Sequence, residues 1–465
     1  MLTYELKKSP GVPLYEALYR CIRGDILSGA LRPGEKLPSK RALAENLEVS
    51  KITVEAAYSQ LLSEGYICSR EKVGYFVETV ERRAPVPAAP ALHPKEDAAC
   101  LLDLTANGTE QFPFSVWSRL QREVMLDFGE ALLAPLPNRG VPELRQAIAG
   151  HLAAFRGMRV DPENILIGAG TDFLYNLLIQ LLGREKVYAV EEPGYGKIRK
   201  IYAAGGVQTV SAAMDDRGVL PESLGSADVL HISPSHHFPT GIATPVSRRR
   251  ELLDWANQGK KWIIEDDYDS EFRFDAHPVP AMQSLDDGGR VIYMNSFSKS
   301  LAPSIRISYM LLPPRLLERY REKLGFYACT VSSFEQYTLA EFIRQGRYEQ
   351  HLSRMKNRYR QRRDAGIRLI GESRLGERAR IMEQDAGLHF LLRLETALPD
   401  GELQRRAAAR GLRLAMLSDY DSRPSAGRAH ILVVNYAGMD LSRLPEALER
   451  LAQVLDEEEL PCTTN

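Results

Sequence analysis

The chain has 465 residues and a net charge of −1, with 44% hydrophobic and 26% charged residues. This length exceeds that of one ordinary domain, and the neutral charge balance excludes a chain that is basic throughout, so any DNA-binding surface must be a local patch. Five scattered cysteines and the lack of an apolar run of about 18 residues exclude a disulfide framework and a membrane span, so we expect a cytoplasmic protein.

The first predicted elements are three helices followed by two strands. Leu14, Leu18 and Ile22 recur every four residues, as on the buried face of a helix. Ser39 and Ser50 stand where the N-caps of a second and a third helix would lie. The expected helices span residues 14–28, 39–47 and 51–64, and the expected strands span 65–67 and 73–77, with a basic turn at 68–70. This order is typical of a winged helix-turn-helix, whose third helix enters the major groove of DNA.

The leading ends of the second and third helices form the candidate DNA-binding surface. Backbone N–H groups that are unpaired at these ends suit phosphates. Residues 14–77 contain nine lysines and arginines against eight aspartates and glutamates, so bulk charge alone also allows a small helical interaction module.

The run from Pro38 to Val54, together with Gly74 to Val77, resembles the GntR family of bacterial regulators. That family usually has an arginine at the position of Lys51, and a lysine there favours phosphate contact over bidentate base reading. The predicted DNA-binding residues are Ser39, Lys40, Arg41, Ser50, Lys51, Thr53, Arg70 and Gly74.

A Pro/Ala-rich segment without apolar periodicity follows this module. We interpret it as a semi-extended linker. The predicted division is a DNA-binding domain at 12–80, a linker at 81–100 and an effector domain at 101–465.

From about residue 101 the chain alternates short apolar strands with amphipathic helices. Strands are expected at residues 164–167, 186–190, 228–232, 261–265 and 291–294. Such alternation predicts a largely parallel α/β sheet whose ligand-binding groups lie at the carboxyl ends of the strands.

Glycine and aromatic residues follow the first two of these strands. A glycine-rich turn that contains Gly170, Thr171 and Asp172 opens a helix. Such a turn binds anions, although it often serves packing only. Tyr195, on a Pro-Gly turn, can stack on a planar ring or simply pack.

Charged and hydroxyl residues follow the last two strands. Asp266 and Tyr268 suit a pyridine nitrogen and a phenolate oxygen, or a helix cap, or a divalent metal. Lys299 taken alone would be a solvated surface lysine, but its amine can also condense with an aldehyde. The neighbours that suit a phosphate are Ser296, Ser298 and Arg306.

Together these residues resemble the fold-type-I pyridoxal-phosphate enzymes of the aminotransferase superfamily across residues 101–458. The resemblance implies that pyridoxal 5′-phosphate forms an internal aldimine with Lys299, while Asp266 pairs with the pyridine nitrogen and Tyr268 bonds the ring hydroxyl. Tyr195 matches the residue that stacks on the ring. The positions that match the phosphate site are Gly170, Thr171, Asp172, Ser296, Ser298 and Arg306.

A GntR-like module ahead of such a domain resembles the MocR subgroup, often called GabR-like regulators. The expected fold is therefore α/β multidomain, a winged helix-turn-helix plus a fold-type-I aminotransferase-like domain. The resemblance also implies a head-to-tail homodimer on operator DNA with two half-sites.

Two departures from the aminotransferase pattern favour sensing over turnover. Phe238 stands where an asparagine donates to the ring hydroxyl, and Val433 falls where an arginine binds the α-carboxylate of the substrate. The residues that can replace this arginine are Arg139, Arg199, Arg273 and Lys197.

We therefore predict a transcriptional regulator that senses pyridoxal phosphate, a small amine or an amino acid through Lys299, with at most slow transamination. One alternative is a working aminotransferase with an appended DNA-binding module. Another is a regulator that binds no cofactor, in which Lys299 is vestigial.

Overall fold

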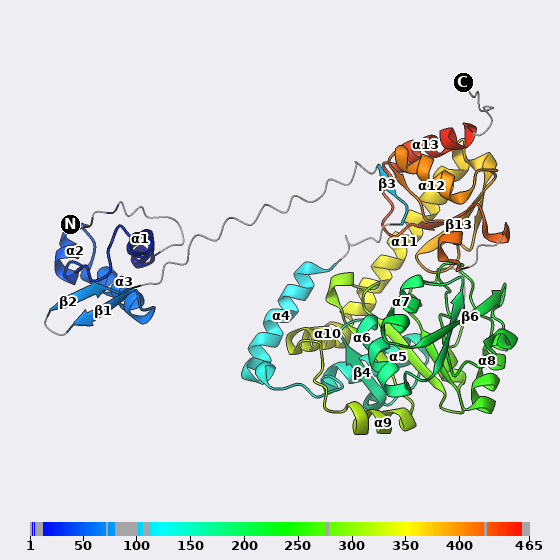
Figure 1. Ribbon diagram of the computed structural model, residues 1–465, viewed down its shortest axis with the longest axis horizontal. Helices are drawn as coiled ribbons and strands as arrows, with labels where there is room; N and C mark the ends of the chain where they lie inside the picture. Colours follow the sequence, from blue (N-terminus) through cyan, green and yellow to red (C-terminus); the bar gives the residue numbers. More distant parts are fainter. Residues whose placement is uncertain are drawn as a thin grey trace. The chain divides into compact units, whose positions relative to one another are not determined.

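The computed structural model describes residues 2, 4, 13–70, 73–79, 101–105, 112–274, 279–422 and 426–457. The chain divides into two compact units, Met1–Glu96 and Asp97–Asn465, which are considered separately (Figure 1). The predicted linker at 81–100 lies outside the described residues. No helix in the described part of the chain is long and apolar enough to cross a membrane.

The N-terminal unit consists of three helices and a two-stranded antiparallel ribbon. Its elements are α1 Leu14–Ser28, α2 Lys40–Asn46, α3 Lys51–Ser63, β1 Ile67–Arg70 and β2 Gly74–Val77. Leu18, Val54 and Leu61 are fully buried in its core. The Tyr58 hydroxyl donates to the Pro38 carbonyl at 2.9 Å, which fixes α3 against the start of α2. The predicted winged helix-turn-helix architecture is confirmed.

The predicted turn at 68–70 is wrong, because these residues belong to β1. Cys68 pairs with Phe76 and Arg70 with Gly74 across the ribbon. The backbone of 68–70 therefore completes its hydrogen bonds in the ladder, despite the polar side chains that suggested a turn.

The Asp97–Asn465 unit is built on one eight-stranded sheet. Its strands are β4 Ile165–Gly168, β5 Val187–Glu192, β6 Gln208–Asp215, β7 Gly218–Val219, β8 Val229–Ile232, β9 Trp262–Asp266, β10 Val291–Ser296 and β11 Ser308–Leu311. They lie in the order β4-β11-β10-β9-β8-β5-β6-β7. The pairs among β10, β9, β8, β5 and β6 are parallel, whereas β11 and β7 run antiparallel to their neighbours. The largely parallel sheet predicted from the alternation of elements is thus confirmed.

Both faces of this sheet are covered by apolar cores. Ile165 and Ile167 point into one core with α5, α10 and α11, whereas Leu166 between them joins the core of α6 and α9 on the other face. This alternation with a period of two is the expected pattern of a strand that is buried on both sides. The helices are α4 Phe114–Phe128, α5 Pro142–Arg156, α6 Thr171–Leu182, α7 Gly196–Ala204, α8 Val246–Gly259, α9 Pro314–Leu324, α10 Ser333–Arg344 and α11 Arg347–Glu372.

The C-terminal part of the chain forms a lobe beside the sheet, and α11 runs between the two (Figure 1). Its elements are β12 Ala379–Met382, β13 His389–Leu394, α12 Asp400–Ala409, β14 Leu412–Arg413, β15 Ile431–Asn435 and α13 Leu444–Asp456. The strands β12, β13 and β15 form an antiparallel sheet, in which Leu391 faces Val433. β14 pairs with β3 Leu102–Asp103, so the beginning of this unit is anchored on the lobe.

Candidate functional site

The polar residues of the main candidate site lie at one edge of the eight-stranded sheet. Asp266 ends β9, Ser296 ends β10 and Gly168 ends β4. Ser308 of the intervening strand β11 pairs with both Ser296 and Gly168, so these strand ends lie level. A cavity of about 410 Å³ lies at this edge. The predicted cofactor-binding residues that line it are Thr171, Asp172, Tyr195, Asp266, Tyr268, Ser296, Ser298, Lys299 and Arg306.

Lys299 lies on the turn that follows β10, with its side chain in the cavity. Burial lowers the pKa of its ammonium group, and the nearby charge of Asp269 opposes this effect. A lowered pKa leaves more of the amine uncharged near neutral pH. The uncharged amine is the form that attacks an aldehyde.

Asp266 has one satisfied and one unsatisfied carboxylate oxygen. The Tyr175 hydroxyl donates to Oδ2, and His231 Nε2 lies 3.7 Å from the same oxygen. Tyr202 hydrogen-bonds the other ring nitrogen of His231 at 2.7 Å, and both of these side chains are buried. Oδ1 is buried and has no hydrogen-bond partner within the described part of the chain. A protonated pyridine nitrogen in the cavity would supply the missing donor.

The glycine-rich turn and Arg306 form a cradle of the kind that binds phosphate. Gly170 precedes α6 with φ 88° and ψ 163°, a conformation essentially restricted to glycine. A Cβ at this position would lie 2.3 Å from Nη2 of Arg306. The same Nη2 lies 3.4 Å from Oδ2 of Asp172, in the first turn of α6. The guanidinium thus lies against the amino end of the helix, whose first N–H groups lack partners within the helix.

Tyr268 and Phe238 both line the cavity. The Tyr268 hydroxyl is 3.3 Å from Nδ1 of His236, and burial and then the charge of Asp269 raise the pKa of this phenol. Phe238 packs edge-on against Tyr420 at 5.0 Å between ring centroids. Position 238 therefore supplies an aromatic contact and no donor.

Tyr195 directly precedes α7 as its N-cap residue and is 50% exposed. Phe238 packs edge-on against it at 5.9 Å. A half-exposed aromatic ring that is braced from the side suits stacking on a planar ring.

Val433 lies on β15, and its side chain is 3% exposed in an apolar cluster with Leu391, Leu417 and Ile431. It lines the cavity without a charge. Of the four basic residues that could replace the missing arginine, only Lys197 lines the cavity, where Nζ lies 2.7 Å from Asp172 Oδ2.

The three candidate arginines contact other parts of the molecule. Arg139 pairs with Glu163, Arg199 pairs with Glu192 and Arg273 donates to the Ser235 carbonyl. These arginines were predicted because of their charge, and their contacts direct the side chains to other parts of the molecule.

Several residues that line the cavity were not found from the sequence. Glu191 is the penultimate residue of β5, and Ser233 directly follows β8, so the rule that selected Asp266 near a strand end also points to both residues. The backbone N–H of Ser233 donates to Glu191 Oε2 at 3.1 Å, and burial raises the pKa of this carboxyl. Tyr175, Ala415 and Tyr420 gave no such signal, because they come from a helix interior and from the C-terminal lobe.

The predicted DNA-binding surface gathers at the amino ends of α2 and α3. Ser39 Oγ accepts from the Ala42 N–H, and Ser50 Oγ accepts from the Thr53 N–H, both at 3.1 Å. The two serines are therefore true N-caps. The Ser50 and Thr53 hydroxyls are also hydrogen-bonded to each other at 2.8 Å.

The basic residues of this surface differ in their ion pairing and exposure. Lys40 is paired with Glu55 at 2.7 Å, and the hydrogen bond to Glu55 raises the pKa of this lysine. Lys51 is exposed, and Ile52 beside it is 77% exposed although apolar. An apolar side chain at the tip of such a helix can contact a thymine methyl group. This residue was not singled out from the sequence.

The remaining predicted contacts lie on the second helix and the ribbon. Arg41 is highly exposed and forms an i,i+4 pair with Glu45 at 2.9 Å. The Arg70 guanidinium lies over the Phe76 ring at 4.5 Å, on the same ribbon. Gly74 has φ 129°, and a Cβ there would come within 3.2 Å of Lys36 Cε, so glycine suits this tight pairing.

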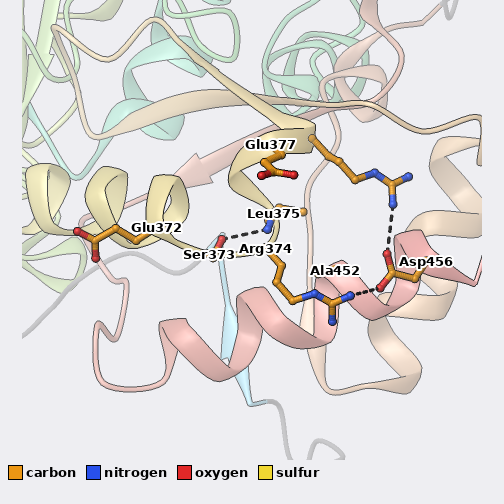
Figure 2. Close-up of a pocket in the computed structure, with 8 residues that line it drawn as sticks. Glu372, Ser373, Arg374, Leu375, Glu377, Ala452 and Asp456 are labelled. Carbon is orange, nitrogen blue, oxygen red and sulfur yellow. Dashed lines mark hydrogen bonds and ion pairs between the residues drawn. The ribbon is translucent and has the colours of Figure 1, made fainter.

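A second cavity, of about 480 Å³, lies between the end of α11 and α13 (Figure 2). Its basic side chains are already paired, because Arg374 contacts both Glu449 and Asp456, and Arg378 contacts Asp456. No lysine and no aromatic ring lines it among the described residues. It therefore offers nothing comparable to the site at Lys299.

Comparison with known proteins finds two family models that match different parts of the chain. Residues 14–77 match the model of the bacterial regulatory proteins of the gntR family, and residues 101–451 match that of the class I and II aminotransferases. The chain is 36% identical to the HTH-type transcriptional regulator YdeL of Bacillus subtilis, over 97% of this chain and 98% of that protein. It is 33% identical to the probable rhizopine catabolism regulatory protein MocR of Rhizobium meliloti, over 96% and 94%.

Among solved structures, the fold is similar to that of the kynurenine aminotransferase of Pyrococcus horikoshii. The two superpose with a TM-score of 0.69 at 23% identity, over 78% of this chain and 92% of that one. The predicted fold class is thus confirmed. The chain belongs to the MocR-like transcriptional regulators, in which a GntR-family helix-turn-helix is joined to a class I and II aminotransferase domain.

Proposed function

We propose that the aminotransferase-like domain of this regulator binds pyridoxal 5′-phosphate covalently through Lys299 and senses the cofactor itself or a small amine that reacts with it. The observation that carries the proposal is Oδ1 of Asp266, a buried acceptor without a partner in the described chain, in the same cavity as Lys299. When bound, the cofactor supplies an aldehyde that condenses with amines.

The residues of this chain would hold each part of the cofactor. Asp266 would accept from the pyridine nitrogen, Tyr268 would donate to the ring hydroxyl, and Tyr195 would stack on the ring. The phosphate would be bound by Gly170, Thr171, Asp172, Ser296, Ser298 and Arg306. Asp172 would contribute through its backbone N–H at the amino end of α6, because its carboxylate already contacts Arg306 and Lys197.

The test is the visible absorption of the purified protein after pyridoxal phosphate is added and excess is removed. We expect a band that survives gel filtration in the wild type and vanishes in Lys299→Ala. Lys197→Ala, a lysine in the same cavity, is the matched control and should retain the band. A wild-type protein without the band, or a band that persists in Lys299→Ala, would contradict the proposal.

For the DNA-binding module, we propose that Lys51 and Arg41 contact operator phosphates. Each alanine variant should weaken operator binding. It should also reduce the slope of log K against log salt concentration by about one unit, as expected for one lost phosphate contact. Lys40→Ala should have the smaller effect because Glu55 already neutralises this lysine. Fluorescence anisotropy at several salt concentrations measures all three, and unchanged binding in both Lys51→Ala and Arg41→Ala would exclude this surface.

We also propose a head-to-tail homodimer with domains at 12–80 and 101–465 and a linker at 81–100, acting on DNA in the cytoplasm. Large apolar side chains at Phe114, Leu126 and Phe326 are each more than 70% exposed, which suits burial against a second copy. A ligand changes the arrangement of the DNA-binding modules only if it binds two arrangements with different affinity. Light scattering that gives a monomer at micromolar concentration would contradict the dimer.

A second candidate function is an active aminotransferase with an appended DNA-binding module. The lowered pKa of Lys299 favours it, since the same amine could transfer protons during transamination. Phe238 and Val433 disfavour it, because neither can bind the groups that an asparagine and an arginine would bind. Steady keto-acid production from an amino donor at rates typical of enzymes would establish this second function.

A further inference from the structure

The basic residues that line the cavity at Lys299 are unevenly placed. Of the lining residues in the described chain, only Lys197, Lys299 and Arg306 are basic. Lys197 and Arg306 both contact the same oxygen, Oδ2 of Asp172, at 2.7 and 3.4 Å. Two of the three positive charges are therefore gathered at the amino end of α6.

The part of the lining that comes from Phe238 and the C-terminal lobe is uncharged and mostly apolar. We call Phe238, Ala415, Tyr420 and Val433 the apolar wall. Their side chains share one apolar cluster, and the N–H of Val433 donates to the carbonyl of Ala415 at 2.8 Å. Backbone pairing of Val433 with Leu391 and ring contacts of Phe238 with Tyr420 and Tyr195 fix this wall in place.

A carboxylate against this wall would lose water without gaining a positively charged partner. Burial of an unpaired charge is strongly unfavourable. Asn435, the lining residue of β15 beyond Val433, uses its side-chain oxygen to accept from the Ala437 N–H and is uncharged. An apolar substituent, in contrast, would gain by contact with the rings and the valine.

We propose that the effector at Lys299 is a primary amine without a carboxylate beside its amino group, and that its apolar substituent packs against the apolar wall. This inference rests on the proposed binding of pyridoxal phosphate by Lys299. In the exchange, one C–N double bond to the effector nitrogen forms as the C–N double bond to Lys299 breaks. Two protons pass from the effector nitrogen to Nζ of Lys299, and no oxidant or reductant is needed.

The experiment compares amines with the amino acids that differ from them only by the carboxylate. The full-length protein loaded with pyridoxal phosphate is titrated with 2-phenylethylamine against phenylalanine, and with 3-methylbutylamine against leucine. Calorimetry and the cofactor absorption give the affinities. We expect each amine to bind at least about tenfold more tightly than its amino acid, which corresponds to a free-energy difference of about 1.4 kcal/mol.

Equal or tighter binding of the amino acids would overturn the inference, and so would a loaded protein that binds neither class. Failure of the proposed function looks different, because the protein would then show no cofactor band at all.

A positive charge added to the apolar wall provides a second test of the same inference. Val433→Arg should improve binding of phenylalanine and leucine by about tenfold, since a charge-assisted hydrogen bond to a carboxylate has this size. Val433→Met adds length without charge and should leave the preference for amines unchanged. A preference that Val433→Arg does not alter would overturn the role of the wall, and the wild-type titrations decide the inference even where this variant does not fold.

Discussion

Two sides of the cavity at Lys299 differ in origin and in chemistry. One side is built from the ends of β4, β9 and β10 and the segments that follow them, and it presents a carboxylate, hydroxyls and a guanidinium. The other side is the apolar wall, which comes mainly from the C-terminal lobe. The polar side suits a cofactor with a ring nitrogen and a phosphate. The apolar side lacks the charge with which an aminotransferase would hold an amino acid, so the two halves suit binding of the cofactor better than turnover.

Replacement of Asp266 should impair the polar side of the cavity more than any other change. In Asp266→Asn the pyridine nitrogen would lose its charged acceptor, and a hydrogen bond to a charged group contributes about 1.5–3 kcal/mol. We expect affinity for pyridoxal phosphate to fall about 10- to 100-fold, measured by equilibrium dialysis. Tyr175→Phe removes only a donor to the other oxygen of Asp266 and should cost less. Wild-type affinity in Asp266→Asn would mean that this carboxylate does not bind the ring.

Replacement of Gly170 in the phosphate cradle should have the next largest effect on the polar side. Alanine at Gly170 would force an L-residue into a conformation essentially restricted to glycine, at a cost of about 1–3 kcal/mol, and its Cβ would displace Arg306. We expect Gly170→Ala to lower both the unfolding free energy and the cofactor affinity, the latter about tenfold.

Gly150 provides the matched control for this variant. It lies in α5, has no atom within 4 Å of its added Cβ and has no positive φ. Gly150→Ala should raise the unfolding free energy by about 0.5–1 kcal/mol and leave cofactor affinity unchanged. Denaturant titrations in which both alanines behave alike would show that the cradle has no special requirement for glycine.

The pH dependence of the reaction of Lys299 with pyridoxal phosphate is a further test of the polar side. Because burial lowers the pKa of Lys299, the rate of covalent capture of pyridoxal phosphate should rise with pH and level off below the range of an ordinary lysine. Asp269 raises this pKa by its charge, so Asp269→Asn should move the profile to lower pH. Stopped-flow absorption measures both profiles. A wild-type rate that keeps rising through the ordinary lysine range would contradict the burial of this amine.

The polar side was far easier to predict from the sequence than the apolar wall. Each strand shows as a short apolar run, and topology requires that parallel strands present their carboxyl ends at one edge. Asp266, Ser296 and Lys299 follow from that rule alone. The wall does not, because Ala415 and Tyr420 are brought to the cavity by the packing of a lobe more than a hundred residues away along the chain.

Local signals also failed where the tertiary structure decides the conformation. The polar run at 68–70 predicted a turn, and pairing with β2 made it a strand. Arg199 and Arg273 carried the right charge for a carboxylate, but their positions on α7 and after β9 direct them to Glu192 and Ser235. Charge and residue type are visible in a sequence, whereas the direction of a side chain depends on contacts that are distant in the chain.

Phe238 marks the boundary between the two sides, and its replacement should have the smallest effect on the cofactor. Asparagine at this position would add a donor near the ring hydroxyl that we propose Tyr268 to bind. A single neutral hydrogen bond contributes about 0.5–1.5 kcal/mol, so the pH midpoint of the cofactor absorption should fall by about one unit or less. Phe238→Leu also removes the ring contacts with Tyr420 and Tyr195 but adds no donor, and it should leave the midpoint in place. If both variants shift the midpoint equally, the aromatic ring itself tunes the cofactor and the missing donor does not. If only Phe238→Asn shifts the midpoint, residue 238 lies close enough to the ring hydroxyl to act with the polar side. Only its apolar side chain then assigns it to the apolar wall.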